Sequence, residues 1–272
     1  MPRALSAQSP GMSFVLRAID CNPQAELIYL NYAFTTINDA KTVTDFDAFY
    51  RDARPIVPSE NDIIGPIRTI SARNENIFTA IYTLVFRRDH AINAYSQNTD
   101  GRPFSSLLTC IPTTYYVLHR MMETHGVWIG APQVVVNMNV SWMRYAALWI
   151  LERIPEAYEV AEKKGADRIE IDRWRRHTWP GVVHYFREIF KEENSDNAAY
   201  FCAARLVRRF KHLPEFRAQQ DELVAVYQDA WRAGHPARPR RADAAPARAS
   251  ERGAAADRGG SARGRGRAGV RG

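Results

Sequence analysis

The feature that most constrains the fold is a short run of large apolar and aromatic residues near the start of the chain. Residues 26–34 read ELIYLNYAF, with Asn22-Pro23 before the run and Asn38-Asp39 after it. A run of this length between turn-forming residues predicts a buried strand. Residues 14–19 have apolar side chains at helical spacing, so this part of the chain is predicted as helix, turn and strand.

Three further segments come before the middle of the chain. Residues 39–75 are polar and contain three prolines, which predicts an excursion over the surface. The β-branched and aromatic second half of residues 77–88 predicts a second buried strand. Residues 113–124 have the spacing of a helix, which Gly126 is predicted to end.

The second half of the chain changes from strand to helix. Residues 127–140 predict a strand with a break at Gly130 to Pro132 and alternation from Val134 onward. From Trp142 to about Trp231 the pattern is helical. Pro155 and Gly165 divide the first long helix, and Trp174, Val182, Phe186 and Ile189 mark a second amphipathic one. We therefore predict an α/β domain over residues 1–141 and a helical extension over residues 142–232.

Residues 233–272 form a tail of different composition. They hold ten Arg and three acids, so they carry the whole net charge of +7 and leave the rest of the chain neutral. The tail lacks large apolar side chains, which predicts disorder. It could bind nucleic acid, whereas the neutral body offers no broad basic face for that purpose. The alternative is that a G+C-rich gene is read in a shifted frame.

Several classes of protein lose their usual support. Residues 1–232 have no GxGxxG, GxxxxGK[ST], GxSxG or HExxH motif. Three widely spaced cysteines argue against a disulfide framework and favour a reducing compartment. No apolar run is long enough to span a membrane. His177 and His184 lie two helical turns apart, but nothing completes a metal set, so solvated or capping roles are expected.

Two short motifs are candidates for a site. Asp45 and Asp47 form a DxD, which could hold a divalent ion bound to a nucleotide diphosphate, although solvated loop carboxylates are the alternative. In the turn that begins at Asn98, Asp100 and Arg102 could orient a sugar hydroxyl or a phosphate. The alternative there is an ordinary Asx-turn.

A third candidate lies at the end of the predicted strand 127–140. With a period of two, Asn137 and Asn139 share one face, and Trp142 follows at the strand exit. Amides beside an aromatic ring could bind the hydroxyls and stack on the ring of a sugar. Solvated amides and a Trp packed in the core would give the same pattern.

The order of these segments resembles a known family. Residues 27–34, 81–89, 104–118 and 134–142, taken together, are similar to the second half of a family 2 glycosyltransferase with the GT-A fold, over about residues 12–230. The resemblance implies a partial GT-A-like mixed sheet with flanking helices. It implies a cytoplasmic bacterial enzyme, free or at the inner membrane face, that builds surface or secreted glycans. Its substrates would be a nucleotide-sugar and a glycan acceptor, and its cofactor Mn²⁺ or Mg²⁺.

The chain departs from that family in two places. The nucleotide-binding half would lie upstream of Met12, so a partial and even inactive chain is expected. The usual catalytic acid would stand at residues 110–114, which read CIPTT, and Asp100 is the nearest substitute. Two other classes stay open. One is a binding module with a nucleic-acid-binding tail, and the other is an enzyme with Cys110 as nucleophile and His119 or His125 as base.

Overall fold

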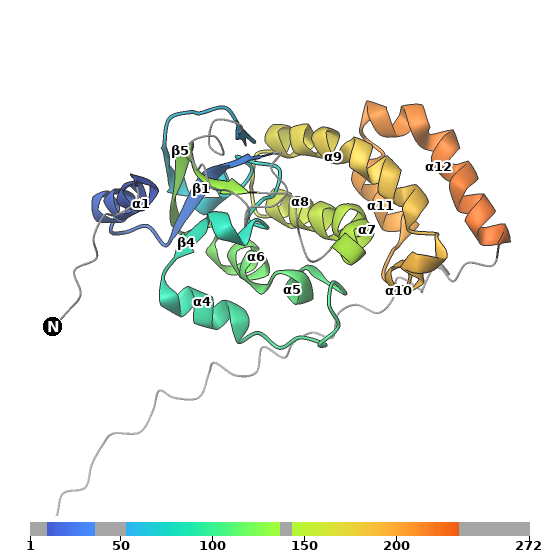
Figure 1. The fold of residues 1–272 in the computed structure, drawn as a ribbon, viewed down its shortest axis with the longest axis horizontal. Helices are drawn as coiled ribbons and strands as arrows, with labels where there is room; N and C mark the ends of the chain where they lie inside the picture. Colours follow the sequence, from blue (N-terminus) through green and yellow to red (C-terminus); the bar gives the residue numbers. More distant parts are fainter. Residues whose placement is uncertain (1–9, 36–52, 137–142, 234–272) are drawn as a thin grey trace, which may run out of the picture. The chain divides into compact units, whose positions relative to one another are not determined.

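A computed structural model describes residues 10–35, 53–136 and 143–233 (Figure 1). These residues belong to one compact unit and fold as a mixed α/β structure. None of the helices in the described ranges combines the length and apolar content needed to cross a membrane.

The predicted buried strand is the centre of the sheet. It forms β1 (Leu27–Phe34), in which every side chain except that of Phe34 is buried. β1 runs parallel to β5 (His125–Val136) and antiparallel to β2 (Arg54–Pro55) and β4 (Leu84–Phe86), and β3 (Ile63–Pro66) lies antiparallel on the far side of β5. The sheet is therefore mixed. β4 confirms a strand in the second half of residues 77–88, although its side chains are only partly buried.

Most of the described residues are helical, and two of the helical elements are π-helical. In chain order the helical elements are α1 (Pro10–Cys21), α3 (Ile67–Ile70), η2 (Ile81–Thr83), α4 (Arg88–Tyr95), α5 (Leu107–Cys110), α6 (Pro112–Tyr116), η3 (Val117–Met121), η4 (Met143–Tyr145), α7 (Ala146–Leu148), η5 (Trp149–Arg153), α8 (Ile154–Lys163), α9 (Arg168–Glu188), η6 (Glu192–Asn194), α10 (Ser195–Ala198), α11 (Ala203–Phe210) and α12 (Pro214–Arg232). The segments η3 and η5 are the π-helical ones. The predicted helical region after Trp142 is confirmed from Met143 onward.

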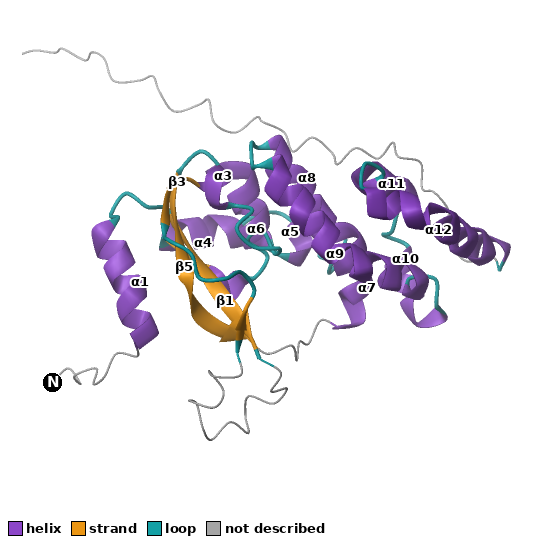
Figure 2. Cartoon of the chain, turned by 90° about the horizontal axis from the view of Figure 1, so that it is seen from above, coloured by secondary structure: helices purple, strands orange, loops and turns teal. Residues whose placement is uncertain are grey.

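The two faces of the sheet are covered by different helices (Figure 2). On one face, Leu27, Tyr29 and Trp128 pack with residues of α8 and α9 in the largest core. On the other, Ile28 and Val127 pack with the partly buried side chains of α1. Both faces of β1 and β5 are therefore apolar, which explains why the run 26–34 has no polar alternation.

The predicted break at Gly130 to Pro132 is a local irregularity inside β5. The strand continues through it, while its register against β1 shifts on both sides of Asn31. The buried Asn31 amide donates hydrogen bonds to the Gly130 oxygen at 2.8 Å and the Val57 oxygen at 3.0 Å. Val134, predicted to face the core, packs against the cluster of Ile28 and Val127. Val134 to Val136 are all partly buried, so burial does not alternate there, and Met138 and Val140 lie outside the described ranges.

Gly126 does not have the predicted role of ending a helix. It lies inside β5, and the preceding helix already ends at Met121. A Cβ at Gly126 would lie 2.8 Å from Ile67 and 2.9 Å from Ile70 of α3. Glycine is needed here because α3 packs directly against the strand.

The predicted surface excursion 39–75 is wrong for its second half. Residues 36–52 lie outside the described ranges, but residues 53–75 contribute β2, β3 and α3. Ile67 and Ile70 of α3 are fully buried. The sequence did not predict this short buried helix, because Ile67 and Ile70 are its only apolar side chains and the surrounding segment is polar.

The helical region divides as predicted. Pro155 lies in the first turn of α8, and Gly165 follows its end with a φ of +88°. On α9, Trp174, Val182 and Phe186 are buried, which confirms the predicted amphipathic helix.

Candidate functional site

A carboxylate and a histidine are paired between the sheet and the helical region. Glu75, in the segment between α3 and η2, places Oε2 2.7 Å from Nε2 of His177 on α9. The Glu75 side chain is 19% exposed and that of His177 is 55% exposed. Tyr158 of α8 donates a hydrogen bond to the Glu75 backbone oxygen at 2.8 Å. Two helices of the C-terminal region therefore fix the position of Glu75.

The backbone just after Glu75 is strained. Ile77 and Phe78 have φ angles of 38° and 66°, although both are non-glycine residues. Such a conformation costs about 1–3 kcal/mol per residue and persists only where the surroundings enforce it. Here both side chains are fully buried, and Thr114 of α6 donates a hydrogen bond to the Phe78 oxygen at 2.6 Å. Strain of this kind clusters at functional sites, which directs attention to this segment.

Two asparagines beside Glu75 attach the segment to β1. The Tyr29 hydroxyl donates to Asn74 Oδ1, and Asn76 Nδ2 donates to the Tyr32 hydroxyl. Asn74 is fully buried, and its Nδ2 has no hydrogen-bond partner in the described part of the chain. The strand thus holds the residues on either side of Glu75.

Tyrosine hydroxyls surround this carboxylate and stay protonated. Burial, and then the charge of Glu75, raises the pKa of Tyr82 to about 12. The same two causes raise the pKa of Tyr32 and of Tyr158 above the usual range. The hydrogen bond to Glu75 raises the pKa of His177. The groups near Glu75 are therefore hydrogen-bond donors at neutral pH.

This arrangement is suited to acid–base chemistry. His177 occupies Oε2 of Glu75, while Oε1 has no hydrogen-bond partner among the described residues. A positioned carboxylate with a free oxygen can take a proton from a hydroxyl group. Tyr82 is 45% exposed and can donate a hydrogen bond to a molecule that approaches from solvent.

Asp100, the predicted catalytic residue, lies elsewhere and is exposed. Its Oδ1 accepts a hydrogen bond from the Arg102 backbone nitrogen at 3.0 Å, and both oxygens lie 3.0 Å from Ser105 Oγ. These hydrogen bonds lower the pKa of Asp100, and the bond from the Arg102 backbone has the largest effect. The Asx-turn interpretation fits this geometry. A carboxylate with a lowered pKa is a weak base.

Arg102, the predicted substrate-binding residue, lines a hollow of about 480 Å³. The same hollow is lined by Tyr145, Asp196 and Tyr200. The Tyr145 ring is held by Phe104, stacked at 4.4 Å between ring centroids. A guanidinium, a carboxylate and two phenols in one open hollow suit a ligand rich in hydroxyl groups.

The other predicted site residues lie outside the described residues. These are Asp45, Asp47, Asn137, Asn139 and Trp142, and the Arg-rich tail lies outside as well. Their roles in metal, sugar or nucleic-acid binding stay predictions. In the ranges that the structure describes, no group of three His, Cys, Asp or Glu side chains is arranged to hold a metal ion.

The alternative with Cys110 as nucleophile gains nothing from the structure. Burial raises the pKa of the Cys110 thiol to about 12. A reactive cysteine needs a lowered pKa, because the thiolate is the nucleophile.

Sequence patterns missed the pair of Glu75 and His177. Glu75 fell in the predicted surface excursion, and His177 was grouped with His184 on one helix face. The available signal was the run Asn74-Glu75-Asn76 directly before the apolar Ile77 and Phe78, since asparagines often fix unusual backbone turns.

Comparison with known proteins returned no match: no protein-family model, no curated protein and no solved structure is significantly similar to the chain.

Proposed function

We propose that the chain is a glycosyltransferase-like protein that transfers a sugar from a nucleotide-sugar to a hydroxyl group of a glycan acceptor, with a partial GT-A-like sheet. The observation that carries the proposal is Glu75, a carboxylate on a strained segment that is fixed by His177 and has one oxygen without a hydrogen bond to any described residue. The resemblance in segment order and the mixed α/β fold support it. The proposed cofactor is Mn²⁺ or Mg²⁺, and three free cysteines support a cytoplasmic location.

In the proposed reaction Glu75 is the general base. Its Oε1 takes the proton of the acceptor hydroxyl while the hydroxyl oxygen bonds to the anomeric carbon of the sugar. The bond from that carbon to the nucleoside diphosphate breaks at the same time, which inverts the configuration. His177 is a positioning residue, because its hydrogen bond to Oε2 directs Oε1 to the substrate.

The hollow beside Arg102 does not include Glu75, and it supports binding of a part of the glycan other than the reacting hydroxyl group. Its guanidinium and the Asp196 carboxylate can bond hydroxyls, and Tyr200 can contact an apolar sugar face. Asp100 holds the Arg102 loop in place through the Asx-turn. We therefore reassign Asp100 from base to positioning residue.

The test is an assay of nucleoside diphosphate release from UDP, GDP and dTDP sugars with Mn²⁺ or Mg²⁺ and a panel of oligosaccharides. Glu75→Gln should lower turnover about 100-fold or more, the usual contribution of a general base. Glu170→Gln is the matched control, because Glu170 is 32% exposed and pairs with Arg173 elsewhere on α9. It should retain full turnover.

Two results would count against the proposal. If the chain neither turns over nor binds any of these nucleotides, the enzyme interpretation fails. If turnover occurs and Glu75→Gln retains it, the base assignment alone fails.

A further inference from the structure

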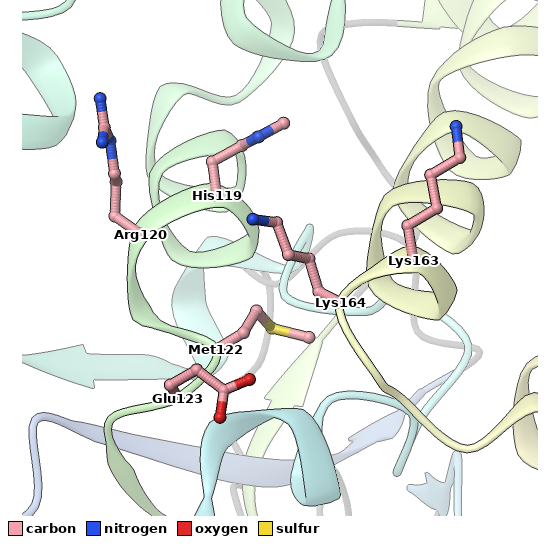
Figure 3. A pocket seen from close by; sticks show the side chains of 6 residues that line it. All are labelled: His119, Arg120, Met122, Glu123, Lys163 and Lys164. Carbon is pink, nitrogen blue, oxygen red and sulfur yellow. The ribbon is translucent and has the colours of Figure 1, made fainter.

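A second hollow, remote in sequence from Glu75, is lined mainly by cationic side chains (Figure 3). It has a volume of about 300 Å³ and lies between the π-helical segment η3 and the end of α8. Its lining residues are His119, Arg120, Met122, Glu123, Lys163 and Lys164. Figure 3 shows the Lys164 side chain extending toward the helix turn that carries His119, with Glu123 and Met122 at the base of the hollow.

Within the described ranges, two of the cations have no carboxylate partner. Glu123 pairs with Arg68, and Lys163 pairs with Glu159 at 2.8 Å. Arg120 and Lys164 form no ion pair with any residue that the structure describes. Two unpaired cations that line one hollow repel each other, and a bound anion would relieve this repulsion.

The negative ends of the neighbouring helices offset only part of this positive charge. Both η3 and α8 end at the hollow, and each helix C-terminus acts as roughly half a negative charge. The two ends together therefore offset about one of the two unpaired positive charges. A net positive charge remains for a ligand.

His119 is placed to sense such a ligand. Its ring lies against Tyr115, with 4.1 Å between ring centroids. Burial, then Lys164 and Arg120, lowers the pKa of His119. The charged groups around the hollow are these two cations, Lys163 and Glu123. The neutral imidazole can donate one hydrogen bond to an anion.

We propose that this hollow binds a small anion that carries a phosphate or diphosphate group. Arg120 offers a planar guanidinium that matches two phosphate oxygens, and Lys164 offers a point charge. The His119 imidazole adds a neutral donor. The π-helical geometry of η3 is a second indication, because π-helical turns occur frequently at functional sites. The site is separate from the proposed sugar transfer at Glu75.

Isothermal titration of the full chain with sodium pyrophosphate, and separately with inorganic phosphate, tests the proposal. We expect saturable binding of one ion, and at least a tenfold weaker affinity in the double variant Arg120→Ala, Lys164→Ala. The control is Arg176→Ala, Lys191→Ala, which removes the same charge from exposed positions that do not line the hollow. This control should bind as the wild type does. A preference for pyrophosphate over phosphate would identify a diphosphate ligand, and the reverse a phosphomonoester.

A second readout separates binding in the hollow from general charge attraction. An anion beside His119 should raise the pKa of its imidazole. Proton NMR of the ring, recorded across a pH titration of the wild type with and without pyrophosphate, measures this change. Equal affinity of the two double variants, or an unchanged His119 titration, would overturn the proposal. So would tighter binding of single-stranded RNA through this hollow than of pyrophosphate. These results do not depend on transferase activity, so the two proposals can fail separately.

Discussion

Replacing the buried carboxylate Glu152 should strongly destabilise the fold. Glu152 lies on η5, and its side chain is only 1% exposed. Its oxygens accept hydrogen bonds from the Cys202 backbone nitrogen at 2.7 Å, from Arg205 at 3.1 Å and from Arg209 at 2.9 Å. This one carboxylate therefore connects the π-helical segment to the start of α11 and to α11 itself.

The magnitude follows from what is left unpaired. Arg209 has a side chain only 6% exposed, so Glu152→Ala would leave a buried guanidinium with only one of its two carboxylate partners, Glu159 at 3.1 Å. Removing one member of a buried ion pair costs about 3–5 kcal/mol. For a domain of this size, that corresponds to a fall in melting temperature of roughly 10 °C. Glu152→Gln should cost less, because the amide oxygen still accepts hydrogen bonds.

Urea denaturation followed by circular dichroism measures the change in the free energy of unfolding. The control is Glu222→Ala, which removes an exposed carboxylate paired with Arg187 and should cost less than about 1 kcal/mol. A double-mutant cycle with Arg209→Met should give a large coupling energy. If Glu152→Ala and Glu222→Ala cost the same, the reasoning from burial is wrong.

Two further predictions concern titratable groups. His177 has a raised pKa in the folded state, so its pairing stabilises the fold below the unfolded pKa of about 6.5 and the effect is lost as pH rises through the folded pKa. The wild type should therefore have a higher free energy of unfolding than His177→Gln, and this difference should be larger at pH 5.5 than at pH 9. The change in the difference should be less than about 1 kcal/mol, because the ring is half exposed. A constant difference across this pH range would contradict the pairing. Iodoacetamide at neutral pH should label the exposed Cys21 well before the half-buried Cys110, whose thiol has a raised pKa. Mass spectrometry that found Cys110 labelled first would restore it as a nucleophile.

The sequence was sufficient to predict elements whose side chains follow one regular pattern. The continuous apolar run 26–34 predicted β1, and the spacing of Trp174, Val182 and Phe186 predicted α9. The register shift beside Asn31 and the π-helical segments were not predictable, because periodicity assumes regular geometry. α3 was missed since only Ile67 and Ile70 make it apolar.

The candidate site residues were predictable only where they are close together in the sequence. The turn at Asp100 and Arg102 is encoded by neighbouring Asn, Asp and Gly residues. Glu75 and His177 lie more than a hundred positions apart, and only the packing of α9 beside the sheet brings them together. No spacing rule along a chain can find such a pair.

The parallel pairing of β1 with β5 has a consequence for how the protein is made. Leu27 pairs with Gly126, so a ribosome adding about 5–20 residues per second releases β1 roughly 5–20 s before its main partner. During this interval LIYLNYAF is an uncharged, β-prone segment of the kind that drives association between nascent chains. β4 is closer in sequence, but it covers only three residues of β1, Leu27 to Tyr29. The period of greatest risk for aggregation is therefore synthesis, when the most apolar strand of the sheet waits for residues that have not yet been translated.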